Sequence, residues 1–261
     1  SVLLAGPMLA KYGKISLSYP GGCSIGLRPI DLHLKGFEAM GAKIDNKHGN
    51  ISICSKKLKG NRIYLDFPSV GATENLIMAA TLTERETLIE NAATEPEITD
   101  LCEFLIKLGA VISGIGTKTI KITGQSKLGG ASHSVIPDRI EAGTYMIAAA
   151  AVKGDITVNN IISEHIKPVI LKLKETGVAI EENENSLRII SDKKLYPTDI
   201  KTLPHPGFPT DMQAAFSVLL SQIKGTSIIT ESIFENRFQH ISELNKMGAL
   251  IKTDGRCAII E

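Results

Sequence analysis

The sequence predicts an α/β protein built from repeated βαβαββ units, and three features of the chain support this fold class. Four helix-like segments end at a glycine and recur about every 70 residues. Their sequences are FEAMGAKI, LIKLGAVI, LKETGVAI and LNKMGALI, which end the helices at Gly41, Gly109, Gly177 and Gly248. The stretches after these glycines alternate apolar and polar residues as strands do. A second apolar helix, followed by a short turn and a strand, recurs out of phase with the first.

Each element is predicted from its local sequence. The out-of-phase helices are expected over residues 2–11, 72–83, 140–152 and 212–223, and the strands after them over residues 15–17, 87–90, 156–158 and 227–229. Further strands, such as residues 51–53 and 120–122, follow the glycine stops, where glycine accepts the left-handed conformation of a helix C-terminus. The helix at residues 140–151 is apolar nearly all round, so we expect it to be enclosed on every side.

Composition excludes several classes of function. The 261 residues are 43% hydrophobic and 22% charged, which is typical of a globular protein. A net charge of +1 does not favour a nucleic-acid partner, and no apolar run reaches the ~18 residues that a membrane span needs. The cysteines and histidines lack metal-ligand spacing, so no metal is expected. Four scattered thiols and no secretory signal indicate a cytoplasmic protein; the thiols are those of Cys23, Cys54, Cys102 and Cys257.

An irregular loop of sequence PGGCSIGLRP, residues 20–29, is the first candidate for chemistry. Its glycines and prolines interrupt the helix and strand pattern. Cys23 lies inside it, five residues before Arg28, whose guanidinium would favour the reactive thiolate. A lone loop cysteine is more often structural than functional, whereas the Gly-Gly setting and the nearby Arg28 favour a functional one, so the residues alone leave both readings open.

Three helix starts form the second group of candidates. Ser69 is a good N-cap, and the same helix end offers free N–H groups to a phosphate, although plain capping is the commoner role. Asp138 and Asp211 occupy equivalent helix starts, where the helix dipole stabilises a carboxylate. Asp211 also follows an irregular approach, HPGFP at residues 205–209, that a simple cap does not need.

Charged residues after two strands are less specific. Arg237, in the sequence FENRF, is expected either to bind an anion or to pair with Glu235. Glu95 and Glu97, in ENAATEPE, are more typical of solvated charge than of a carboxylate site. The phosphate-loop, HExxH and GxSxG signatures are absent from the sequence.

Six motifs together resemble the enolpyruvyl transferase family, and within it the members that act on UDP-N-acetylglucosamine. The motifs are PGGCSIGLRPIDLHLKGFEAMGA, SVGATENLIMAA, ENAATEPEI, PDRIEAGTY, HPGFPTDMQA and FENRF, which appear in family order and cover essentially the whole chain. This resemblance implies two inside-out, barrel-like α/β domains of three βαβαββ units each. Residues 1–134 would hold two units of the domain that carries the Cys23 loop, and residues 135–261 two units of the second domain.

Two observations indicate a piece of a longer protein. The chain starts at Ser1 rather than at methionine, and only four of the family's six units are recognisable. The family's Lys-Asn motif and its phosphoenolpyruvate-binding arginine have no counterpart here. We therefore expect little or no turnover from residues 1–261 alone.

The implied reaction transfers enolpyruvate from phosphoenolpyruvate to the 3′-hydroxyl of UDP-N-acetylglucosamine and releases phosphate, the first committed step of peptidoglycan synthesis. No cofactor is implied. Cys23 would donate a proton, form an adduct with phosphoenolpyruvate and be alkylated by fosfomycin. Asp211 would act on the hydroxyl as a base or, because a helix start weakens it as a base, mainly position it. Arg28 would bind phosphate.

The resemblance also assigns substrate contacts. The uridine contacts correspond to Arg28, Pro29, Ile30, Asp31 and Leu32, the diphosphate contacts to Phe67, Pro68, Ser69 and Val70, and the remaining contacts to Thr210, Asp211, Ile233 and Arg237. Phe67 stands where some members carry lysine, so one charge contact would be missing. The alternatives are an inactive fragment or structural module of the same fold and, ranked lower because the GGC loop is intact, 5-enolpyruvylshikimate-3-phosphate synthase. The oligomeric state is left open.

Overall fold

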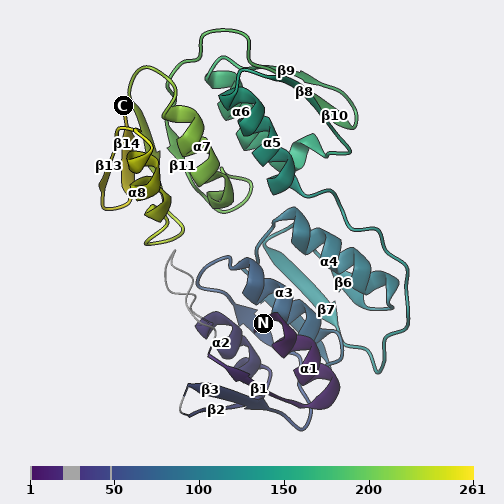
Figure 1. The fold of residues 1–261 in the computed structure, drawn as a ribbon. Coiled ribbons are helices and arrows are strands. Elements are labelled where there is room, and N and C mark those ends of the chain that lie inside the picture. The colour runs from purple at the N-terminus through teal and green to yellow at the C-terminus, as the bar shows by residue number, and fades with distance from the viewer. Residues whose placement is uncertain (1, 20–29, 48) are drawn as a thin grey trace. The chain divides into compact units, whose positions relative to one another are not determined.

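The computed structural model describes residues 2–19, 30–47 and 49–261. The described chain forms two compact units, one that ends at Ile136 and one that spans Pro137–Glu261 (Figure 1). Each unit has its own hydrophobic core, in which helices pack against sheets. The protein is of the α/β class, as the sequence predicts, and its sheets are mixed or antiparallel.

Unit 1 begins with a three-stranded sheet and two helices. Its elements are η1 (Val2–Leu4), α1 (Ala5–Tyr12), β1 (Lys14–Ser18), α2 (Asp31–Ala39), β2 (Lys43–Lys47) and β3 (Asn50–Cys54). The strand order is β1-β3-β2, and both pairings are antiparallel.

The second half of unit 1 adds a four-stranded sheet. Its elements are β4 (Arg62–Tyr64), α3 (Val70–Ala80), β5 (Glu86–Glu90), α4 (Pro96–Lys107), β6 (Val111–Ser113) and β7 (Thr119–Thr123). In the order β4-β5-β7-β6, the first pair is parallel and the other pairs are antiparallel.

Unit 2 contains the same two kinds of sheet. Its first elements are α5 (Arg139–Ala151), β8 (Asp155–Asn159), η2 (Ser163–Ile166), α6 (Lys167–Glu175), β9 (Ala179–Glu182) and β10 (Ser186–Ile190). Its later elements are β11 (Ile200–Lys201), η3 (Thr210–Met212), α7 (Gln213–Leu220), β12 (Ser227–Thr230), α8 (Gln239–Lys246), β13 (Ile251–Asp254) and β14 (Cys257–Ile260). The sheet orders are β8-β10-β9 and β11-β12-β14-β13, with β11 and β12 parallel.

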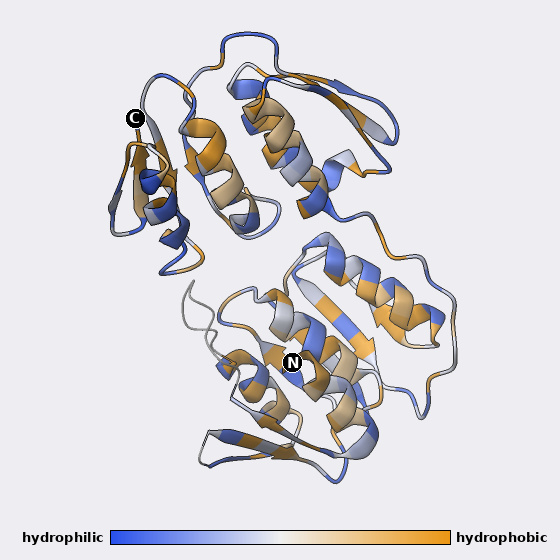
Figure 2. Ribbon diagram, in the orientation of Figure 1, coloured by the Kyte–Doolittle hydropathy of each residue, from blue (hydrophilic) through white to orange (hydrophobic). Residues whose placement is uncertain are grey.

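The strands bury one face each, because side chains alternate along them. In β7, Ile120 and Ile122 are fully buried while their neighbours face solvent, and Figure 2 shows this alternation as orange and blue bands. Leu76 and Ile77 of α3 are also fully buried and belong to the same hydrophobic core as Ile120 and Ile122. The hydrophobic effect therefore ties each sheet to its helices.

Most of the predicted elements are confirmed. The predicted out-of-phase helices match α1, α3, α5 and η3 with α7, and the strands after them match β1, β5, β8 and β12. All four helix-stop glycines have positive φ: Gly41 at 88°, Gly109 at 103°, Gly177 at 95° and Gly248 at 100°. The conformation that requires glycine there is the one inferred from the sequence.

The expectation for α5 is wrong, because this helix is not enclosed on every side. Ala142, Met146 and Ile147 are buried, but Tyr145 is 57% exposed and Ala148 also faces solvent. Alanine counts as apolar in a pattern yet exposes little apolar area, so an alanine-rich helix tolerates a solvent face.

Candidate functional site

In unit 2, four predicted site residues come from two loops at one edge of a sheet. The strands β11 and β12 are parallel, so their carboxyl ends lie side by side. The loop after β11 leads to Thr210 and Asp211 at the start of the η3–α7 helical segment. The loop after β12 contains Ile233 and Arg237. The topology therefore explains why residues far apart in sequence meet here.

Asp211 and Arg237 form the ion pair of this site. Arg237 Nη2 donates to Asp211 Oδ1 at 2.6 Å. The Arg237 side chain is 16% exposed and lies over the ring of Phe234, with 5.2 Å from the guanidinium carbon to the ring centroid. The Asp211 carboxylate is 52% exposed, so a ligand can reach it. The alternative that Arg237 merely pairs with Glu235 is therefore wrong, because Asp211 is its partner.

Glu231 also belongs to this group, although the sequence motifs do not point to it. It follows β12 directly, it is 1% exposed, and it accepts hydrogen bonds from both loops. In the sequence, Glu231 comes directly after the apolar strand pattern SIIT. A charged residue is almost never fully buried unless it is paired, so this position was the available signal for a paired, buried carboxylate.

In unit 1, the predicted uridine and diphosphate stretches begin neighbouring helices. Ile30 is buried, Asp31 is exposed and Leu32 is half-buried at the start of α2. The stretch Phe67, Pro68, Ser69 and Val70 leads into α3, with Phe67 43% exposed and the other three half-buried. Ser69 Oγ accepts a hydrogen bond from the Ala72 N–H at 3.3 Å, so the predicted cap is confirmed.

A buried polar network holds these two helices together. Asn75 Nδ2 donates to His33 Nδ1 at 3.0 Å and to the Val2 carbonyl at 2.8 Å. Asn75 Oδ1 accepts from the Gly6 N–H at 2.6 Å. A Cβ at Gly6 would collide with the Asn75 backbone, so glycine allows α1 to approach α3 closely. Because Nδ1 of His33 accepts, the ring is neutral, and burial lowers the pKa of His33 to about 4.

This neutral histidine predicts a loss of stability in acid. The folded-state pKa of His33, about 4, lies below the ordinary value of 6.5. The neutral ring therefore makes its full contribution to the free energy of unfolding above pH 6.5, and this contribution is lost as pH falls toward 4. At pH 4.5 the loss should be about 2–3 kcal/mol, from 1.36 kcal/mol per pKa unit. The measurement is urea unfolding of wild type and His33→Gln at pH 7 and 4.5. Equal acid sensitivity of both proteins would contradict the assignment.

Two further expectations have clear outcomes. Asp138 caps α5 as expected, since Oδ1 accepts from the N–H groups of Ile140 and Glu141 at 2.8 and 3.1 Å.

The expectation of solvated charge near α4 is wrong for Glu95, which is 9% exposed. Burial, followed by the charges of Glu97 and Glu95, raises the pKa of nearby Glu74 to about 7. Tertiary packing around α3 and α4 encloses these groups, which a charge pattern does not reveal.

Cys23, Arg28 and Pro29 lie outside the described residues, so their roles stay predictions.

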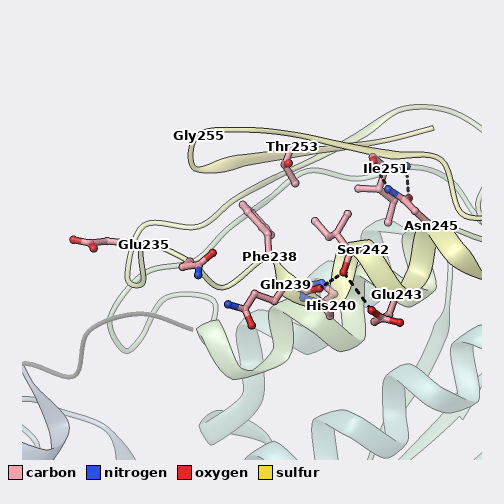
Figure 3. A pocket seen from close by; sticks show the side chains of 12 residues that line it. Glu235, Phe238, Gln239, His240, Ser242, Glu243, Asn245, Ile251, Thr253 and Gly255 are labelled. Carbon is pink, nitrogen blue, oxygen red and sulfur yellow. Dashed lines mark hydrogen bonds between the residues drawn. The ribbon is translucent and has the colours of Figure 1, made fainter. Parts of the chain in front are cut away.

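A pocket of about 800 Å³ lies in unit 2, between α8 and β13 (Figure 3). Phe238, Ser242 and Thr253 are among its lining residues. Of the predicted site residues that the structure describes, none lines this pocket. In residues 2–19, 30–47 and 49–261, no helix is long and apolar enough for a membrane span, and no cluster of metal-ligand side chains occurs.

Comparisons with known proteins agree with the resemblance. UDP-N-acetylglucosamine 1-carboxyvinyltransferase 2 of Carboxydothermus hydrogenoformans is 57% identical over 263 residues, which cover 100% of this chain and 63% of the relative. The enzyme named UDP-N-acetylglucosamine 1-carboxyvinyltransferase in Halothermothrix orenii is 56% identical with the same coverage. The chain thus spans 63% of the length of these relatives.

Solved structures support the fold. The enolpyruvyl transferase NikO of Streptomyces tendae matches with a TM-score of 0.86 at 20% identity, over 99% of this chain and 62% of that one. EPSP synthase of Acinetobacter baumannii matches with a TM-score of 0.68 at 24% identity, over 100% of this chain and 62% of the other. A sequence model described as EPSP synthase (3-phosphoshikimate 1-carboxyvinyltransferase) matches residues 1–261. The chain therefore belongs to the EPSP synthase family of enolpyruvyl transferases.

Proposed function

We propose that the protein transfers enolpyruvate from phosphoenolpyruvate to the 3′-hydroxyl of UDP-N-acetylglucosamine and releases phosphate, in peptidoglycan synthesis. The observation that carries this proposal is the 57% identity, along the entire chain, to relatives named for that acceptor. We place the reaction in the cytoplasm, without a nucleic-acid or membrane partner.

The reaction assigns a task to each residue type in the site. Cys23 gives a proton to the methylene carbon of phosphoenolpyruvate while the sugar oxygen bonds to the adjacent carbon. The hydroxyl proton is taken up by the Asp211 carboxylate. Loss of phosphate, together with return of a proton from the new methyl group to the Cys23 thiolate, then restores the double bond. Arg28 and Arg237 offer cations to anionic substrate groups, and the Asp211–Arg237 pair at 2.6 Å supports placing Asp211 and Arg237 in one site.

The uridine and diphosphate would bind to unit 1. The start of α3 offers backbone N–H groups at Val70 and Gly71, beside the capped turn of Ser69. Ile30 is the N-cap of α2, and Asp31 and Leu32 begin this helix. Lys35 of α2 forms an ion pair of 2.6 Å with Asp66. This arrangement supports a binding surface made from two helix starts and the segments before them.

We also propose that the chain contains four copies of one βαβαββ unit, two in residues 1–134 and two in residues 135–261, as parts of two barrel-like domains. The support is the recurring order of helix, strand, helix and two strands, which each copy shows. The two four-stranded sheets also share one parallel pair followed by antiparallel pairs.

The test uses the protein from the complete reading frame. We expect phosphate release from phosphoenolpyruvate that depends on UDP-N-acetylglucosamine. Release that instead requires shikimate 3-phosphate would establish the related 5-enolpyruvylshikimate-3-phosphate synthase activity. Release with neither acceptor present would refute the proposed function, and no release with both acceptors present would refute it and leave a structural role.

A further inference from the structure

The buried carboxylate of Glu231 in unit 2 accepts four hydrogen bonds and has no role in the proposed reaction. Its Oε1 accepts from Thr202 Oγ1 at 2.9 Å and from the N–H groups of Ile233 and Phe234 at 2.8 and 3.1 Å. Its Oε2 accepts from Thr210 Oγ1 at 2.8 Å. One side chain thus joins the ends of both parallel strands to both site loops.

Burial of this charge needs a reason beyond packing. Taking a carboxylate out of water costs several kcal/mol, and the four donors that satisfy it here are neutral. An apolar side chain at this strand end would fill the space without that cost. The geometric effect of Glu231 is that the loop after β11 and the loop after β12 both donate hydrogen bonds to the same buried carboxylate.

These two loops carry the two members of the ion pair. Thr210, which donates to Oε2, immediately precedes Asp211. Phe234, whose N–H donates to Oε1, supports the guanidinium of Arg237 on its ring at 5.2 Å. Glu231 is therefore linked to Asp211 on one side and to Arg237 on the other.

We infer that Glu231 is a positioning residue, which sets the relative placement of Asp211 and Arg237 for the transfer reaction. The inference rests on the proposed function. Glu231 does not touch substrate; it acts through Thr210 and through the 233–234 backbone. A displacement of about 1 Å in such groups is enough to reduce turnover about 10²-fold.

Glu231→Gln in the full-length protein is the direct test. The amide keeps the shape but has one acceptor oxygen, so it satisfies the Thr210 hydroxyl or the backbone N–H groups and not both sets as acceptor. We expect kcat to fall about 10²-fold while the protein remains folded. Ile229→Val is the matched control, since Ile229 is buried in β12, two residues before Glu231. The control should keep the wild-type kcat.

A second variant covers the case in which Glu231→Gln does not fold. Thr210→Val removes the Oε2 contact and should reduce kcat, whereas Thr210→Ser keeps the hydroxyl and should be less impaired. If Thr210 and Glu231 act as one unit, the double variant Glu231→Gln/Thr210→Val should be no slower than the slower single variant.

The outcomes separate this inference from the proposed function. Wild-type kcat and KM in Glu231→Gln, equal losses in Ile229→Val, or fully additive losses in the double variant would overturn the positioning role while the enzyme stays active. If Glu231→Gln does not fold, wild-type kinetics in Thr210→Val overturn it. An inactive wild-type protein would instead refute the proposed function itself.

Discussion

Replacing Cys23 by serine is expected to reduce the rate of product formation by about 10²–10⁴-fold, the range that a positioned general acid contributes. A thiol has an ordinary pKa near 8.5, whereas an aliphatic hydroxyl is a far weaker acid and a poorer soft nucleophile. Serine therefore preserves the size of the side chain but not its ability to protonate the enol methylene. The measurement is phosphate release from phosphoenolpyruvate that depends on UDP-N-acetylglucosamine, with the full-length protein.

The other thiols supply the controls for this prediction. Cys54→Ser and Cys257→Ser should keep wild-type rates, because these residues lie in β3 and β14. Burial raises the pKa of the Cys102 thiol to about 12, so it should also resist alkylation. Fosfomycin should label Cys23 and spare the other three, as read by peptide mass mapping. A wild-type rate in Cys23→Ser, or a label at another cysteine, would remove Cys23 from the mechanism.

The parts of the fold that could be predicted are those set by local sequence. The residue that ends each of these helices adopts the left-handed conformation, which glycine accepts most readily, and all four glycines have positive φ. Strand β7 could be located because its alternation gives it one buried face. These signals are carried by a few consecutive residues, so tertiary contacts do not override them.

The short strands β4 and β11 could not be located in the same way. They have three and two residues, which are too few for a periodic pattern. They are strands because they pair in parallel with β5 and β12, respectively. The solvent face of α5 was also missed, since a hydrophobic pattern does not record which neighbours exist. Long-range pairing decides such elements.

The same division applies to the candidate site. Ser69 and Asp138 were recognisable as caps because a cap is a contact over two or three residues. The partner of Arg237 lies 26 residues away, and the donors to Glu231 lie on two different loops. The resemblance assigned Asp211 and Arg237 to substrate contacts, but only the structure gives the contact between them.

That contact leads to the second large prediction. Asp211→Asn should lower kcat by about 10²–10⁴-fold, because the amide can neither take up the proton of the 3′-hydroxyl nor form the charged pair with Arg237. Arg237 occupies Oδ1, so Oδ2 is the oxygen that we expect to meet the sugar hydroxyl. Steady-state kinetics of the full-length protein, with kcat and the KM for UDP-N-acetylglucosamine measured separately, give the result.

Asp138→Asn is the control, because Asp138 is the same residue type at another helix start, where it is the N-cap of α5, whereas Asp211 lies inside η3, whose N-cap is Pro209. Asn caps helices about as well as Asp, and Asp138 Oδ1 accepts from two backbone N–H groups of α5. If Asp211 served only as a helix cap, both substitutions would be nearly silent; if it acts on the hydroxyl, only Asp211→Asn should lower kcat. Wild-type kcat in Asp211→Asn would exclude it from the chemistry. Equal losses in the two variants would assign the effect to the helix starts, since the Asp138 carboxylate has no part in the proposed reaction.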